Sequence, residues 1–282
     1  MRCECQTGGW KGSTMVFLKG KNTSVLVLLF IMLWLTGCGT KQTENDRLAS
    51  QTEITVSAAA SLTDALQEIK KNYLEEHPEV KINFNLGGSG SLQQQIVQGA
   101  PVDLFIPASE KYMNTLVDKG LIDQGEQVSL LSNELTVITH ANEGITIQGP
   151  GDLLDDEVRK IAIGIPESVP AGKYAKEALE HTGVWEVLLP KMVQAKDVRQ
   201  VLQYVETRNV ETGMVYKTDA LSSDEVKIAY TMDFSTYSPI VYPMGIIRTS
   251  KHKQGAMDFY NYLRSEEAMN VFVKYGFSGP GV

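Results

Sequence analysis

The feature that most constrains the fold of this chain is an alternation of short apolar segments with amphipathic ones. The apolar segments are rich in β-branched residues, as buried strands of an α/β sheet are. They cover residues 54–58, 80–86, 103–108, 134–139, 160–165, 213–216, 226–230 and 241–247. Between them, helical patterns cover 62–77, 92–98, 111–119, 172–181, 197–208 and 255–265. The alternation predicts an α/β fold with a mostly parallel, doubly wound sheet, but it does not divide the chain into lobes.

The N-terminal segment predicts export. Two lysines precede an apolar run over 25–35 (VLVLLFIMLWL), and Thr-Gly-Cys38 follows it. Such a run suits a secretory signal and is short for a bilayer-spanning helix. The end of the run resembles a lipobox, which implies cleavage before Cys38 and a lipid on its sulfur; the alternative is a plain signal peptide with an incidental cysteine. We therefore expect 1–37 to be a lipoprotein signal peptide, with Met15 as an alternative start.

Cysteine use agrees with export, because Cys38 is the last of the three cysteines and the sequence after it offers no disulfide. A domain of this size buries a sufficient core without such cross-links. Residues 38–52 are polar and predict a flexible tether between the lipid anchor and the fold.

The charge of the chain excludes one class of partner. The formal net charge is −8, and the first 37 residues hold four basic and one acidic residue, which leaves −11 for the remainder. An acidic chain without a basic patch is not expected to bind nucleic acid. Any anionic ligand must be held by a local arrangement of donors, because the overall field repels it.

Four places share a design in which a strand ends, small or hydroxylated residues follow and a helix begins. They are 57–64 (SAAASLTD), 87–92 (GGSGSL), 169–172 (VPAG) and 196–199 (KDVR). Ser61 with Asp64 is expected to form a capping box, and Asp197 is expected to cap the last of these helices. The N–H groups at helix starts attract anions, and strand ends of α/β sheets line the ligand crevice. Together the four places predict an oxyanion site built from neutral donors.

Taken singly, each place has an ordinary explanation. The glycines around Ser89 are explained by relief of backbone strain, and Tyr216 by a half-buried position at a strand end. Asp197 and Arg199 are expected to be solvated. The glycine-rich segment is neither a P-loop nor a nucleophile elbow, because the residues that define those motifs are missing. Only the combination of the four places carries the prediction.

The order of these motifs resembles the periplasmic molybdate-binding protein family, ModA. The resemblance runs from about residue 53 to 277. It is carried by 58–62 (AAASL), 99–106 (GAPVDLFI), 169–179 (VPAGKYAKEAL), 197–199 (DVR), 215–220 (VYKTDA) and 275–277 (YGF).

This resemblance implies the two-lobed type II periplasmic-binding-protein fold, with the ligand in the cleft between the lobes. Lobe 1 is expected to take 53–131 and 233–282, and lobe 2 to take 132–232. The family holds its oxyanion with two serines, backbone amides and a tyrosine. Matched by motif, these are Ser61, Ser89, the amides of Ala171 and Val198, and the hydroxyl of Tyr216. A shift of register would replace Ser89 with Ser91.

A site made of donors alone prefers an oxyanion that carries no proton. Molybdate, tungstate and sulfate meet this condition at neutral pH, whereas hydrogen phosphate would leave its O–H unpaired, at a cost of about 1–3 kcal/mol. Size must separate sulfate from molybdate, and tungstate is expected to bind as molybdate does. The resemblance further implies a monomeric, lipid-anchored protein on the outer face of the cell membrane. It would have no catalytic residue or cofactor and would deliver its ligand to an ABC importer permease and ATPase.

Two other classes of protein fit the sequence less well. A secreted hydrolase using Ser61 or Ser89 as nucleophile needs a histidine base. The histidines are His77, His140, His181 and His252, and none is expected to face the site. A ferric-chelate binding protein needs several converging tyrosines or carboxylates, whereas the matched set contains Tyr216 alone.

Overall fold

The computed structural model describes residues 52–280. The predicted signal peptide, Cys38 and the predicted tether up to residue 51 lie outside this range. Within residues 52–280, no helix is both long and apolar enough to cross a membrane.

The first sheet, sheet A, has the strand order β2-β1-β3-β10-β4. Its strands are β1 (Thr52–Ala59), β2 (Val80–Gly87), β3 (Leu104–Ile106), β4 (Ile122–Asn133) and β10 (Ile240–Ile247). The helices that pack with it are α3 (Thr63–Glu76), α4 (Ser89–Val97), α5 (Glu110–Asp118), α10 (Lys253–Leu263) and α11 (Glu266–Lys274). The one-sided apolar pattern predicted for the first helix buries Leu66, Ile69 and Tyr73 of α3.

The second sheet, sheet B, has the order β7-β6-β8-β5-β9. Its strands are β5 (Leu135–His140), β6 (Ile161–Gly164), β7 (Met192–Ala195), β8 (Thr212–Tyr216) and β9 (Val226–Thr231). Its helices are α6 (Pro170–His181), α7 (Trp185–Leu188), α8 (Val198–Glu206) and α9 (Lys217–Leu221). Short 3-10 turns are η1 (Ala60–Leu62), η2 (Pro150–Leu154), η3 (Leu189–Lys191) and η4 (Phe234–Thr236).

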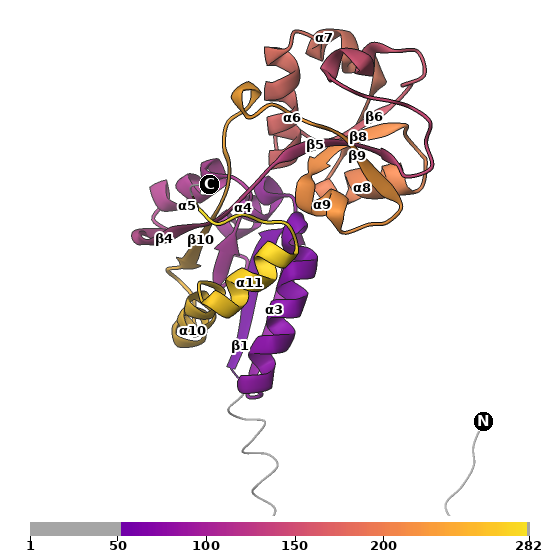
Figure 1. The fold of residues 1–282 in the computed structure, drawn as a ribbon. Helices are drawn as coiled ribbons and strands as arrows, with labels where there is room; N and C mark the ends of the chain where they lie inside the picture. Colours follow the sequence, from indigo (N-terminus) through magenta and orange to yellow (C-terminus); the bar gives the residue numbers. More distant parts are fainter. Residues whose placement is uncertain (1–51, 281–282) are drawn as a thin grey trace, which may run out of the picture. The chain divides into compact units, whose positions relative to one another are not determined.

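Each sheet belongs to one lobe, and the chain crosses between the lobes twice (Figure 1). Glu134 alone separates β4 of sheet A from β5 of sheet B, and η4 lies on the return from β9 to β10. In each sheet the strand that follows a crossing, β5 or β10, runs antiparallel to its neighbours. The α/β class and the two-lobed fold are therefore confirmed. The residue boundaries predicted for the lobes stay a prediction, which the membership of the two sheets supports.

Two strands lie outside the segments predicted from the sequence, and both are edge strands. β4 is at one edge of sheet A and β7 is at one edge of sheet B. Exposed and half-exposed positions fill the first part of β4, and β7 has four residues with one fully buried. An edge strand faces solvent along one side, so polar residues interrupt the apolar run from which a strand is predicted.

The start of α6 is pressed against the end of β6. A Cβ atom placed on Gly172 would overlap the carbonyl group of Gly164, so a side chain there is sterically excluded. The glycine pair therefore fixes the N-terminus of α6 directly beyond the carboxyl end of its strand, where ligands of α/β proteins bind.

Candidate functional site

The five residues predicted to bind an oxyanion line a single cavity between the lobes. Lobe 1 contributes Ser61 and Ser89, and lobe 2 contributes Ala171, Val198 and Tyr216. The cavity measures about 10 Å³, taken as the volume that the centre of a water molecule can reach. Pockets for drug-sized ligands measure about 300–1,000 Å³. The space therefore suits a small inorganic ion better than an organic metabolite.

Ser61 lies in η1 at the carboxyl end of β1, and its side chain is buried. Its Oγ is 2.9 Å from the hydroxyl of Tyr242 in β10. The predicted capping box is wrong, because neither η1 nor α3 has a side-chain cap at its N-terminus. Tyr242 was not predicted as part of the site. It lies within an apolar strand, and no motif in the sequence marks it.

Ser89 is the first residue of α4 and is fully buried. Its Oγ accepts a hydrogen bond from the backbone N–H of Ala108, with an N···O distance of 3.0 Å. Ser91, the alternative from a shifted register, is exposed and does not line the cavity. The hydroxyl hydrogen of Ser89 remains available, because the serine oxygen acts as the acceptor in its bond with Ala108.

Lobe 2 presents two helix N-termini to the cavity. Ala171 is the second residue of α6, which begins at Pro170. Val198 is the first residue of α8, and Asp197 caps this helix as predicted by accepting the N–H of Gln200. The first N–H groups of a helix have no acceptor within the helix and carry a partial positive charge. Both backbone amides are therefore suited to an anion in the cavity.

Tyr216, the last residue of β8, lines the cavity on the lobe 2 side. It is 1 % exposed, and its hydroxyl has no hydrogen-bond partner within the described residues. Burial raises the pKa of this phenol well above its usual value, so the group keeps its proton. A buried hydroxyl without a partner costs about 1–3 kcal/mol, which a ligand oxygen would recover.

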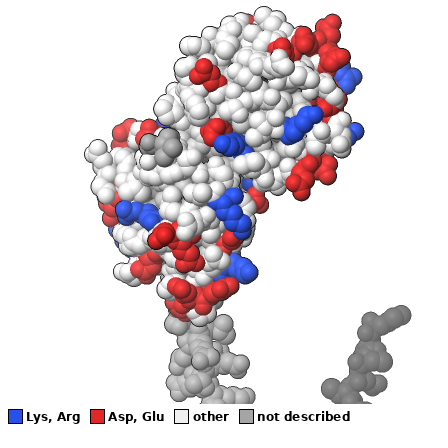
Figure 2. Space-filling model, viewed as in Figure 1, with Lys and Arg blue, Asp and Glu red and all other residues white. Residues whose placement is uncertain are grey.

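None of the residues lining the cavity is charged. On the face drawn in Figure 2, acidic and basic side chains are interspersed over both lobes and form no basic patch. The attraction for an anion therefore has to come from hydroxyl groups and helix amides, as the sequence predicted.

The guanidinium group of Arg199 is paired with one acidic residue of each lobe. Nη2 of Arg199 in α8 is 2.5 Å from Oδ2 of Asp64 in α3, and Nε is 2.9 Å from Oδ1 of Asp219 in α9. Arg199 was expected to be solvated, which is wrong, since its side chain is 25 % exposed. Desolvation of the fully buried Asp219 raises its pKa to about 6, although Arg199 lowers it.

Further hydrogen bonds cross between the lobes near the cavity. The N–H of Gly90 donates to the carbonyl of Ser168, Tyr112 donates to the carbonyl of Glu167, and Tyr174 donates to the carbonyl of Ala108. These contacts mark a closed arrangement of the cleft.

The glycines around Ser89 are needed for this closure. A Cβ atom on Gly88 would lie 2.7 Å from the carbonyl oxygen of Lys196, and one on Gly90 would lie 2.7 Å from that of Ser168. Neither glycine has a positive φ, so relief of backbone strain does not explain them. They allow the backbones of the two lobes to approach each other.

The cavity lacks the groups that the alternative functions need. None of the four histidines lines it, so neither serine has a base beside it. Within residues 52–280 there is no group of three His, Cys, Asp or Glu residues that could hold a metal ion. The cavity lining thus brings no histidine to the two serines and contains one tyrosine, Tyr216.

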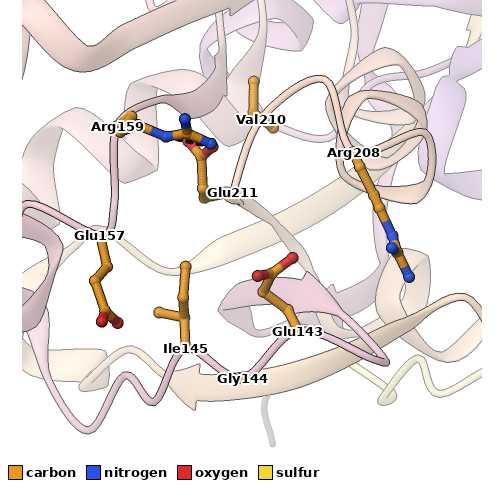
Figure 3. Close-up of a pocket in the computed structure, with 8 residues that line it drawn as sticks. All are labelled: Glu143, Gly144, Ile145, Glu157, Arg159, Arg208, Val210 and Glu211. Carbon is orange, nitrogen blue, oxygen red and sulfur yellow. Dashed lines mark hydrogen bonds and ion pairs between the residues drawn. The ribbon is translucent and has the colours of Figure 1, made fainter.

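A larger depression of about 570 Å³ lies in lobe 2, away from the predicted site (Figure 3). Its three glutamates outnumber its two arginines. Arg159 is paired with Glu211 at 2.6 Å, and Arg208 is 3.2 Å from Nδ1 of His140. This depression is therefore a poor site for an anion, although it is larger than the cavity between the lobes.

Comparisons with known proteins agree with the geometry of the fold. The family model described as bacterial extracellular solute-binding protein matches residues 54–278. YvgL of Bacillus subtilis, named as an ABC transporter substrate-binding lipoprotein, is 46% identical over 258 residues, which cover 92% of this chain and 98% of YvgL. The molybdate-binding protein ModA of Escherichia coli is 38% identical over 237 residues, covering 82% of this chain and 91% of that protein.

A solved structure shares the fold. The periplasmic molybdate-binding protein of Azotobacter vinelandii aligns with a TM-score of 0.74 and 23% identity, over 80% of this chain and 99% of that one. The predicted resemblance to ModA is thereby confirmed at the level of the family and the fold. The chain belongs to the bacterial extracellular solute-binding proteins.

Proposed function

We propose that this protein captures molybdate outside the cytoplasm and delivers it to an ABC importer, and that it accepts tungstate as well. The observation that carries the proposal is the cavity between the lobes, which gathers three hydroxyl groups and two helix N-termini with no charged side chain. Five neutral donors converging on a small space suit a compact dianion and offer it no proton acceptor.

The proposed ligand residues are Ser61, Ser89, Ala171, Val198 and Tyr216. The likeness to ModA of Escherichia coli supports molybdate as the ligand, and the name of YvgL supports delivery to an ABC transporter. The implied partners are the permease and the ATPase of that importer. A site of neutral donors holds the dianion without an opposite charge, which favours its release to the permease.

Sulfate is the competing ligand, because it too carries no proton at neutral pH. A donor-only cavity rejects hydrogen phosphate by leaving its O–H unpaired, at a cost of about 1–3 kcal/mol, which corresponds to roughly tenfold to a hundredfold in affinity. Such a cavity separates sulfate from molybdate by size alone.

Calorimetric titration with molybdate, sulfate, hydrogen phosphate and ferric citrate tests the proposal. We expect tight binding of molybdate, weaker binding of sulfate, binding of hydrogen phosphate about tenfold to a hundredfold weaker than that of molybdate, and no measurable binding of ferric citrate. Ser89→Ala should weaken molybdate binding, whereas Ser91→Ala, two residues away and exposed, should not. Tight binding of sulfate but not molybdate would mean that sulfate is the ligand. Tight binding of ferric citrate would mean that the ligand is a metal chelate and not a tetrahedral oxyanion.

We further propose that the protein is a monomer held at the outer face of the membrane by a lipid on Cys38. The name of YvgL as a lipoprotein supports the anchor. Cys38→Ser should leave the protein without lipid, so that it is shed or remains an uncleaved precursor. Lipid labelling that persists in this variant would contradict the anchor while leaving the ligand proposal intact.

A further inference from the structure

A chain of hydrogen bonds leads from the crossing between the lobes to the cavity. Asn133, the last residue of β4, places its Nδ2 3.2 Å from the hydroxyl of Tyr242, and this hydroxyl is 2.9 Å from Oγ of Ser61. Asn133 and Ser61 are nearly buried, and Tyr242 is fully buried. Of the three, only Ser61 lines the cavity.

The orientation of the Asn133 amide is fixed by its other contacts. Its Oδ1 accepts the backbone N–H of Glu134 at 2.9 Å, and a backbone N–H can only donate. The group facing Tyr242 is therefore the NH₂ of the amide, which also donates to Oγ1 of Thr218 at 2.9 Å. Both amide hydrogens have an acceptor in this orientation.

The direction of the next bond follows. The oxygen of Tyr242 accepts from Asn133, and its own hydrogen has one acceptor within the described residues, which is Oγ of Ser61. Burial raises the pKa of Tyr242 well above its usual value, so this hydrogen is retained. If Ser61 instead donated to Tyr242, the phenol hydrogen would be buried without a partner, at a cost of about 1–3 kcal/mol.

We propose that Asn133 and Tyr242 are specificity-determining residues that hold Ser61 as a hydrogen-bond donor toward the cavity. Because Ser61 receives the hydrogen of Tyr242, its own hydrogen is free to point at the ligand. Neither Asn133 nor Tyr242 lines the cavity, so both act through Ser61. The inference rests on the proposed function and identifies which residues exclude a protonated oxyanion from the lobe 1 side.

The same rule operates at Ser89, whose oxygen accepts from the N–H of Ala108. The difference is that a backbone N–H always donates, whereas a phenol can also accept. The Ser61 contact is therefore the one whose direction depends on side chains, and substitution can change it.

Tyr242→Phe removes the hydrogen donated to Ser61 and keeps the ring. Ser61 can then accept the O–H of hydrogen phosphate while donating to another of its oxygens. We expect molybdate to bind about threefold to tenfold more weakly, while the ratio of the dissociation constants of hydrogen phosphate and molybdate falls about tenfold or more. Both constants are measured by calorimetry at a mildly alkaline pH, where phosphate is the monohydrogen dianion.

Tyr237→Phe is the matched control. This tyrosine is also buried near the crossing, and its hydroxyl accepts the N–H of Leu135 at 3.2 Å without contacting Ser61. It should lower the melting temperature without changing the ratio of the two dissociation constants.

Asn133→Asp is a second variant that covers the failure of Tyr242→Phe to fold. It is isosteric and puts an acceptor where Tyr242 now meets a donor, so the phenol hydrogen turns to the new carboxylate and Ser61 turns its lone pair to the cavity. The added charge repels both dianions alike and cancels in the ratio, which should again fall.

Tight molybdate binding by the parent with an unchanged ratio in either folded variant would overturn the roles of Asn133 and Tyr242 but not the proposed function. A parent that binds no molybdate would overturn both.

Discussion

In lobe 1 both hydroxyl groups of the cavity already have a hydrogen-bond partner in the protein, whereas in lobe 2 the hydroxyl of Tyr216 has no partner within residues 52–280. Ser61 and Ser89 are thus oriented before a ligand arrives. Tyr216, together with the amides at the starts of α6 and α8, gains its partners only from a ligand.

Because of this difference, the two lobes have different roles in ligand binding. Lobe 1 is preorganised and can select an oxyanion by its protonation state. Lobe 2 contributes groups whose desolvation is repaid only when the cleft is closed around the ligand. A ligand that touches both sides should therefore shift an open–closed equilibrium toward the closed form, and the size of the shift is set by its differential affinity for the two forms.

The largest effect is expected from Gly90→Ala, which interferes with the approach of the lobes. Its methyl group would lie 2.7 Å from the backbone of Ser168 across the cleft. Overpacking of this kind typically costs about 1–3 kcal/mol, so molybdate affinity should fall up to about a hundredfold. The apo protein should lose less stability than the closed form, because the two nearest atoms belong to Ser168 across the cleft, and within lobe 1 the methyl group meets only the ring of Tyr112, at 3.0 Å.

Gly125→Ala serves as the control for this variant, since a methyl group there meets no atom within 4 Å. Calorimetry and thermal melting of both variants check the expectation. If Gly90→Ala lowered the apo melting temperature but left the affinity intact, the close approach would matter for the fold and not for the ligand.

The hydroxyl groups of the two lobes are distinguished by a smaller effect, which is on the stability of the apo protein. Tyr216→Phe and Ser61→Ala should each weaken molybdate binding by about 1–3 kcal/mol, because each removes a donor to a buried dianion. Tyr216→Phe should leave apo stability unchanged or higher, since it removes an unpartnered buried group. Ser61→Ala should lower apo stability, since it leaves the Tyr242 hydroxyl hydrogen unpaired. Thermal melting measures apo stability. Equal effects of the two substitutions would contradict the difference between a partnered hydroxyl in lobe 1 and an unpartnered one in lobe 2.

The smallest effect concerns the ion pairs of Arg199 with Asp64 and Asp219. The pKa of Asp219 is raised from 3.8 to about 6, so the folded protein binds this proton more tightly than the unfolded chain. The resulting stability is complete below the unfolded pKa and is lost as pH rises through about 6. As pH rises from about 4 to about 7, the free energy of unfolding of Asp219→Asn should therefore increase relative to that of the parent, by on the order of 1 kcal/mol.

Urea unfolding of this variant and the parent at both pH values measures the gain. Asp64→Asn, the lobe 1 partner of Arg199, is 40 % exposed and should show no comparable trend. If the stability difference between Asp219→Asn and the parent does not change with pH, Arg199 already offsets the desolvation of the Asp219 carboxylate.

The sequence was sufficient to predict the parts of the molecule that follow from local rules. Strong apolar alternation predicted the central strands, and the motifs at strand ends predicted four places for an oxyanion site. The five residues that line one cavity, Tyr216 among them, followed from the resemblance to ModA. Pro170 and Asp197 behave as their local preferences require. The edge strands β4 and β7 escaped prediction, because solvent on one side breaks their apolar pattern.

The parts that escaped prediction depend on long-range contacts. Tyr242 lies 181 residues from Ser61, and Arg199 lies 135 residues from Asp64. No local pattern marks such pairs, so the sequence predicts neither the contact of Ser61 with Tyr242 nor that of Arg199 with Asp64. The role of Gly88 and Gly90 likewise becomes visible only when the opposite lobe is in place.

The central claim is that one molybdate ion is held by donors from both lobes. Crystals grown with molybdate, with diffraction data collected at the molybdenum absorption edge, test it most directly. We expect one anomalous peak in the cavity, with oxygens in hydrogen-bonding range of Ser61 and Ser89 on one side and of Tyr216 on the other. A peak contacting one lobe alone, or one in the depression beside Arg159 and Arg208, would contradict it.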